Sequence, residues 1–267
     1  MRGKPLPHGV TDGLDFRGFD DYAPGMDVRH LDWPLYARTN RLYVRRYAEE
    51  SAGMLVILVD ASGSMGIANQ RKWRRARDIA AVMVFTALRE LHQVVLGVVH
   101  DGRPLWLPPT AGLDFVTEAF DFLASIAPKG RTDLAGALAA LPKRRLPGRA
   151  VILSDGLDPS GGEAAFAQCA QRGLGAELGL IRLEGELVLP STSEAVSNPE
   201  GKGVCRVEPT AEAVAAFDAR VRAHDEALWA SARRYQCAVR TLSVDASLSS
   251  AVEQMMGARP RSSAGRP

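Results

Sequence analysis

The chain of 267 residues is long enough for one α/β domain with additions, or for two small domains. Its hydrophobic fraction of 46% can supply a substantial core, and 33 basic against 31 acidic residues are too evenly balanced to favour nucleic acid or a membrane surface as partner. Three cysteines far apart in the chain form neither a disulfide framework nor a zinc site, and no apolar run reaches the roughly 18 residues of a membrane span. We therefore expect a soluble cytoplasmic protein with no membrane span.

Apolar runs of strand length alternate with helical patterns from residue 53 onward. In chain order we expect a strand at 53–60, a helix at 71–92, strands at 93–100 and 103–109, helices at 112–126 and 133–141, a strand at 149–155, a helix at 161–172, a strand at 176–183, a long helix at 210–235, a strand at 237–244 and a last helix from 247. This alternation predicts a doubly wound, mostly parallel α/β sheet with helices on both faces.

Residues 185–209 interrupt the alternation. They contain Asn198-Pro199-Glu200-Gly201, a turn signal that predicts a small β-hairpin insertion before the long helix. The main domain is expected over 51–257. Around it we expect a flexible N-terminus at 1–13, an arm at 14–50 that packs on the domain, and a disordered tail at 258–267.

The helix expected at 71–92 begins with a basic run. Its basic residues are Arg71, Lys72, Arg74, Arg75 and Arg77. A run of charges on one helix is typical of a solvated face, and we expect that here, with the docking of an acidic partner as the alternative.

Oxygen-bearing side chains gather at the ends of two predicted strands. Asp60, Ser62 and Ser64 lie at alternate positions at and just past the end of the strand at 53–60, so they can project toward one point. Asp155 ends another strand, and Thr132 precedes a helix. Open α/β sheets place their sites at the carboxyl ends of the strands. Two carboxylates and three hydroxyls from three loops would suit Mg²⁺, which prefers oxygen ligands, and would leave part of its coordination open.

The same residue types are also ordinary turn and helix-cap residues. Ser62 or Thr132 could cap a helix with no metal nearby. The three residues from 60 to 64 do not decide between these interpretations by themselves. The presence of Thr132 and Asp155 on the appropriate loops favours the metal site.

Asp-x-Ser-x-Ser, a Gly-x-Thr segment and a later Ser-Asp-Gly together resemble the metal-ion-dependent adhesion site (MIDAS) of von Willebrand factor A domains. The resemblance implies that Ser62, Ser64 and Thr132 offer hydroxyls to Mg²⁺, with Mn²⁺ or Ca²⁺ as alternatives. It implies that Asp60 and Asp155 act as direct ligands or through bound water. The remaining position would take a Glu or Asp from a protein partner.

The arm carries a second resemblance. Pro24-Gly25, the Asp-x-Arg-x-Leu-Asp-Trp of residues 27–33 and the Ala-Arg-Thr of residues 37–39 resemble the segment that precedes the A domain in domain-of-unknown-function family 58. Departures from that pattern are Asp15, Asp20 and Met26, which replace a glutamate, an arginine and an aspartate. The resemblance implies an adaptor or chaperone-like factor that works with a MoxR-type AAA+ ATPase, and no enzymatic activity.

Two other functions stay open at this stage. Asp60 and Asp155 could hold a metal that activates water, which would make the chain a phosphoesterase. The arm interleaves arginines with aromatic residues, a pattern that can bind single-stranded nucleic acid. A P-loop and a Gly-x-Ser-x-Gly elbow are both missing from the sequence, so it offers no sign of ATP hydrolysis or of a serine nucleophile.

Overall fold

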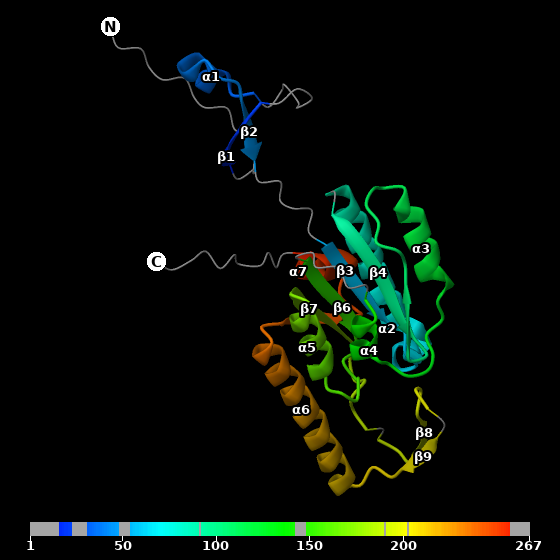
Figure 1. Cartoon of the computed structure of the whole chain (residues 1–267). Coiled ribbons are helices and arrows are strands. Elements are labelled where there is room, and N and C mark those ends of the chain that lie inside the picture. Colours follow the sequence, from blue (N-terminus) through cyan, green and yellow to red (C-terminus); the bar gives the residue numbers. More distant parts are fainter. Residues whose placement is uncertain are drawn as a thin grey trace. The chain divides into compact units, whose positions relative to one another are not determined.

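The computed structural model describes residues 16–22, 31–47, 54–90, 92–141, 148–189, 191–201 and 203–256. Contacts divide the chain into two compact units, residues 1–52 and residues 53–267 (Figure 1). The smaller unit contains the arm, and the larger unit carries the main sheet. The expected flexible N-terminus at 1–13, the motif residues at 24–29 and the expected tail at 258–267 lie outside the described residues.

The arm contains one pair of strands and one short helix among its described residues. Strand β1 (Phe16–Asp21) pairs antiparallel with β2 (Tyr43–Tyr47), and helix α1 (Trp33–Thr39) lies between them in the chain. Asp32 caps α1, because its Oδ1 accepts a hydrogen bond of 2.7 Å from the Leu35 N–H. The packing of the arm on the larger unit stays a prediction.

The larger unit is built on a six-stranded sheet in the order β10-β7-β6-β3-β4-β5. Its strands are β3 (Met54–Asp60), β4 (Gln93–His100), β5 (Arg103–Trp106), β6 (Gly148–Ser154), β7 (Leu174–Arg182) and β10 (Ala238–Ser243). Neighbouring strands are parallel except β4 and β5, which are joined through Asp101 and Gly102, both with positive φ as tight hairpin turns require. The predicted doubly wound, mostly parallel α/β sheet is confirmed.

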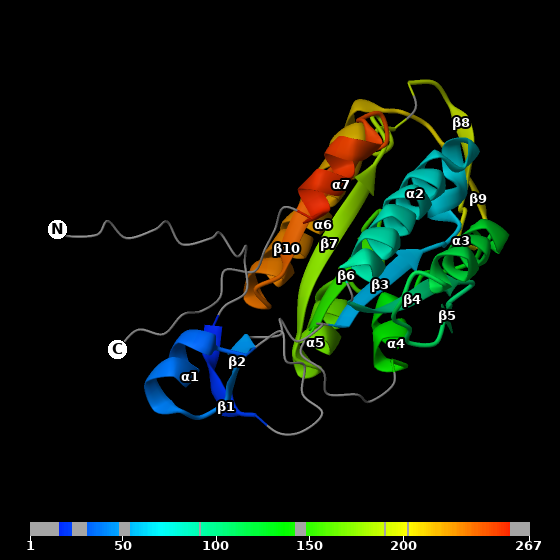
Figure 2. The same cartoon turned by 90° about the horizontal axis from the view of Figure 1, so that it is seen from above.

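Helices cover both faces of this sheet (Figure 2). One face carries α2 (Ile67–Arg89), α3 (Phe115–Ser125) and α7 (Leu248–Met256), and the other carries α4 (Leu134–Ala139), α5 (Glu163–Gln171) and α6 (Ala211–Arg234). Of the helices in the described ranges, none is long and apolar enough to cross a membrane.

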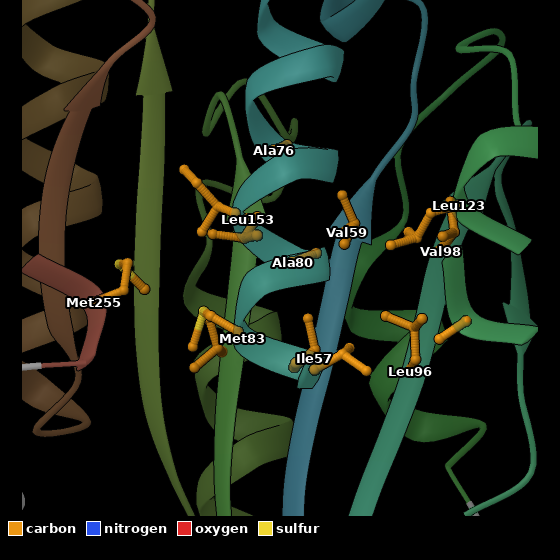
Figure 3. Packing of buried hydrophobic residues seen from close by; sticks show 14 of the residues in the cluster. Ile57, Val59, Ala76, Ala80, Met83, Leu96, Val98, Leu123, Leu153 and Met255 are labelled. Atoms are coloured by element: carbon orange, nitrogen blue, oxygen red, sulfur yellow. The ribbon is translucent and has the colours of Figure 1, made fainter. Parts of the chain in front are cut away.

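Helix α2 lies along the middle of its face of the sheet. Its residues Ala76, Ala80 and Met83 pack with Ile57 and Val59 of β3 in one buried apolar cluster (Figure 3). The small alanine side chains let the helix lie close to the strand. This packing fixes the start of α2 beside the end of β3, where Asp60 lies.

The chain between β7 and α6 contains the predicted hairpin. Strands β8 (Glu194–Ser197) and β9 (Val204–Val207) pair antiparallel and form a separate two-stranded sheet. The predicted β-hairpin insertion is therefore confirmed. Figure 2 shows it beside the start of α2, at the edge of the sheet where β3 ends.

Candidate metal centre

The sheet order explains how three separate segments reach one place. Strands β3 and β6 are parallel neighbours, with Val59 opposite Leu153, so Asp60 and Asp155 emerge side by side at the carboxyl edge. The segment that carries Thr132 is tied to the loop after β3. The Gly63 N–H donates to the carbonyl oxygen of Gly130 at 2.9 Å, and the Lys129 N–H donates to that of Ala61 at 3.0 Å.

Asp60 is the centre of the hydrogen bonds at this edge. Its Oδ1 accepts from the backbone N–H of Ser62 at 2.9 Å. Its Oδ2 accepts from the hydroxyls of Ser154 at 2.7 Å and of Thr132 at 3.2 Å. The hydroxyl oxygens of Ser62 and Ser64 lie 3.1 Å apart. The structure thus brings four of the five expected site residues into direct contact, together with Ser154, which the sequence analysis had not singled out.

These side chains are buried, and the burial perturbs Asp60. Asp60 and Ser62 are 0% exposed, and Asp155 is 1% exposed. Burial, with a further contribution from the negative charge of Asp155, raises the pKa of Asp60 from 3.8 to about 6, and hydrogen bonds from Ser154 and Ser62 partly oppose this shift. Two buried carboxylates whose charges act on each other favour the binding of a cation near them.

Asp155 also contacts a buried cation from the chain itself. The Nζ of Lys72, on α2, donates to Asp155 Oδ2 at 2.7 Å and also forms an ion pair with Glu186. The side chains of Lys72, Asp155 and Glu186 are 0%, 1% and 4% exposed. The other oxygen of Asp155, Oδ1, accepts from the Leu157 N–H at 3.1 Å.

The expectation of a solvated basic face is wrong for Lys72. Arg71 is exposed and pairs with Asp245, as expected of a surface residue, but Lys72 is fully buried. A signal for this was present in the sequence. Lys72 lies four residues before Ala76, and Ala76 lies four before Ala80, so the lysine falls on the apolar stripe that faces the sheet. No sequence pattern indicated Glu186 as its partner.

The donor set fits a divalent cation. The described residues contain no group of three or more His, Cys, Asp and Glu side chains placed to hold a metal, so a metal here would rely on hydroxyl oxygens as well as carboxylates. Such hard oxygen donors suit Mg²⁺ better than softer metals. Of the two carboxylates in this donor set, Asp155 is paired with the ammonium of Lys72, so its negative charge is partly offset before any cation binds.

Several solved structures have similar backbones. The VWA domain of SpRpn10 is 14% identical with a TM-score of 0.46, over 76% of this chain and 94% of that chain. The pilus adhesin SpaC of Lactobacillus rhamnosus GG is 11% identical with a TM-score of 0.46, over 76% of this chain and 30% of the adhesin. The TRAP protein of Plasmodium vivax, in its manganese-loaded form, is 16% identical with a TM-score of 0.35, over 48% of this chain and 56% of TRAP. All three scores lie below 0.5, and the manganese is a property of the Plasmodium protein.

Sequence relatives are also found among curated proteins. Uncharacterized proteins of Mycobacterium bovis and Mycobacterium tuberculosis are each 34% identical to this chain over 145 residues, which is 52% of this chain and 45% of the relative. The chain spans about half the length of the curated relatives it matches.

One family matches a larger part of the chain. The family described as "Protein of unknown function DUF58" matches residues 19–227. This span begins in the arm, contains β3 and all the residues of the candidate metal centre, and ends within α6. Since the matched span is well over half of the sequence, this chain belongs to the DUF58 family.

Proposed function

We propose that this chain is a metal-dependent protein-interaction module with a von Willebrand factor A-like body. Its metal site consists of Asp60, Ser62, Ser64, Thr132 and Asp155. The observation that carries the proposal is the environment of Asp60, whose two buried oxygens gather side chains and backbone from three separate segments. The preferred ion is Mg²⁺, with Mn²⁺ or Ca²⁺ as alternatives.

The chemistry of the donors argues for binding an anionic group. When bound, a divalent ion among neutral hydroxyls would retain much of its positive charge and attract a carboxylate. The chain's own residues supply the shielding, because the side chains around Asp60 exclude water and strengthen any charge-assisted contact made there. We infer that the partner supplies a Glu or Asp.

The nature of the partner rests on the family resemblance. It favours a MoxR-type AAA+ ATPase, beside which the chain would act as an adaptor or chaperone-like factor, without catalysis and in the cytoplasm. The even charge balance of 33 basic and 31 acidic residues does not favour nucleic acid as the partner.

The phosphoesterase alternative has less support. Asp155 is engaged through Oδ2 with Lys72 and through Oδ1 with the Leu157 N–H, so it is poorly suited to accept a proton from water. Asp60 likewise accepts hydrogen bonds at both of its oxygens. Neither carboxylate is therefore a convincing general base.

Affinity capture from the native organism tests the proposal. The wild type, Thr132→Ala and Ser125→Ala would each be used as bait, in Mg²⁺ and in chelator. Ser125 is a matched control, because it is an exposed hydroxyl at the end of α3 that donates to the Phe122 carbonyl. Partners should be retained by the wild type and Ser125→Ala in Mg²⁺ alone. Equal retention in chelator or by Thr132→Ala would contradict a metal-dependent interface.

A further inference from the structure

Thr132 reaches the candidate metal centre from the segment between α3 and α4. Its hydroxyl donates to Oδ2 of Asp60 at 3.2 Å. On the N-terminal side of Thr132 the segment is held by a backbone hydrogen bond, in which the Gly102 N–H donates to the carbonyl oxygen of Arg131 at 2.7 Å. The position of the Thr132 hydroxyl therefore depends also on what holds the segment on its C-terminal side.

A buried carboxylate, that of Asp158, holds this C-terminal side. Its Oδ2 accepts from the N–H of Leu134, two residues after Thr132, at 3.3 Å. Its Oδ1 accepts from the N–H of Ser160 at 2.7 Å, within its own loop. Asp158 is 5% exposed and lies between β6 and α5, three residues after Asp155. One side chain thus joins the segment that carries Thr132 to the loop that carries Asp155.

The amide that Asp158 binds has no acceptor within its own helix. Leu134 is the first residue of α4, and the first N–H groups of a helix find no partner inside it. The N-cap residue Asp133 accepts from the Gly136 N–H, so its Oδ1 serves a different amide. Leu134 is 3% exposed, which leaves water little access to its N–H. Loss of the Asp158 carboxylate would leave this buried donor unsatisfied, which favours a shift of the segment.

We propose that Asp158 is a positioning residue of the metal centre, which sets the Thr132 hydroxyl through the backbone of Leu134. This inference rests on the proposed function and adds a residue outside the proposed set of ligands. Asp158 does not bind the ion itself, because both of its oxygens accept from backbone N–H groups. Within the described ranges it also belongs to no group of three His, Cys, Asp or Glu side chains placed to hold a metal. Residues that orient a ligand in this way affect metal affinity by about 10- to 100-fold.

The test is a double-mutant cycle of Asp158→Ala and Thr132→Ala in the full chain, with Mg²⁺ affinity measured by titration calorimetry. Asp158→Ala alone should bind Mg²⁺ about tenfold more weakly than the wild type. The double variant should bind no more weakly than Thr132→Ala, because Asp158 acts only through the Thr132 hydroxyl. The matched control is Asp133→Ala, which removes the same charge and one hydrogen bond from the segment but leaves the bond between Asp158 and Leu134. It should keep the affinity of the wild type.

Three results would overturn this inference and leave the proposed function standing. They are wild-type affinity in Asp158→Ala, a loss in the double variant that equals the sum of the two single losses in free energy, and an equal loss in Asp133→Ala. A wild type that binds no Mg²⁺ overturns the proposed function and this inference together.

A second variant keeps the test valid if circular dichroism shows that Asp158→Ala is unfolded. Asp158→Asn then takes its place in the same cycle. Its one carbonyl oxygen replaces two carboxylate oxygens, so its amide group faces one of the two N–H donors. Asp158→Asn should therefore weaken Mg²⁺ binding in the presence of Thr132 and not in Thr132→Ala, and equal losses in both backgrounds would overturn the inference.

Discussion

The ammonium of Lys72 lies 2.7 Å from Oδ2 of Asp155, and neither side chain is more than 1% exposed. A buried ion pair loses a large solvation energy from both ions, so its net contribution to stability is small, but removing one partner leaves the other charge buried alone. Lys72 also pairs with Glu186, so its single positive charge holds two carboxylates of different segments together. Its charge therefore affects both folding and metal binding.

We expect Lys72→Met to destabilise the metal-free protein by about 3–5 kcal/mol, since two buried carboxylates lose their counter-charge. The same change should increase the stabilisation that Mg²⁺ confers, because the site becomes more negative. Urea unfolding in chelator and in Mg²⁺ measures both effects. The control is Arg71→Met, whose pair with Asp245 is about half exposed. That control should lose less than about 1 kcal/mol. Equal losses from the two substitutions would contradict the buried position of Lys72.

Ser62→Ala should weaken Mg²⁺ binding by about tenfold or more, because substitutions of residues that only contact a metal's ligands already lower metal affinity by about that factor. The fold should survive, because the loss is one hydroxyl worth about 1 kcal/mol. Titration calorimetry with circular dichroism separates the two effects, and Ser125→Ala is the exposed control. If Ser62→Ala binds Mg²⁺ with the affinity of the wild type, the Ser62 hydroxyl is not a metal ligand.

Asp60 should make the metal-free protein less stable as the pH rises. Its pKa is raised from 3.8 to about 6 by burial and by Asp155, so the folded state prefers the neutral carboxyl. The stability associated with that preference is fully present below pH 3.8 and is lost as the pH rises through about 6. Over that window the loss is on the order of 3 kcal/mol.

The substitution Asp60→Asn isolates this effect from other titrating groups. In chelator the variant should gain stability relative to the wild type between pH 4 and pH 7, the gain growing to about 3 kcal/mol. In Mg²⁺ the order should reverse, because the variant loses a ligand. A stability difference in chelator that does not change with pH would show that Asp60 is not desolvated as described.

Gly63→Ala should release the hairpin turn from the metal loop. The backbone φ of Gly63 is −58°, so the local backbone tolerates alanine. The added Cβ would clash with the carbonyl oxygen of Pro199, and because this atom belongs to the backbone, a side-chain rotation cannot relieve the clash. We expect faster tryptic cleavage at Arg206, which lies exposed on β9. Gly175→Ala is the control, because no atom lies within 4 Å of its added Cβ. Identical cleavage rates in the two variants would contradict the contact at Gly63.

Limited proteolysis can also test whether the arm packs on the larger unit. Trp33 and Leu42 are 60% and 37% exposed, and such apolar surface on a small unit is expected to be covered. Cleavage after Arg38 should then be slow compared with cleavage in the tail after residue 257. Rapid cutting at Arg38 would indicate that the arm does not pack in this way.

The sheet, the order of its elements and the placement of the oxygen-bearing residues at the strand ends all follow from patterns in the amino-acid sequence. Continuous apolar runs specify buried strands, and helical periodicity between them specifies parallel crossovers. Asp60 and Asp155 lie at or just after the ends of two such strands, so parallel geometry alone brings them to one edge. Local pattern was sufficient for these features because each depends on residues close together in the chain.

The surroundings of those oxygens depend on contacts between segments that lie far apart in the chain. Lys72 meets Asp155 across 83 positions and Glu186 across 114, and the turn at Pro199 reaches Gly63 from the insertion. A lysine in a run of arginines is expected to be exposed to solvent, because burying a charge is unfavourable. The local sequence does not show whether a distant carboxylate compensates for that cost. Whether a charge is buried depends on its partners, and these partners are brought together only when the insertion folds back on the sheet edge.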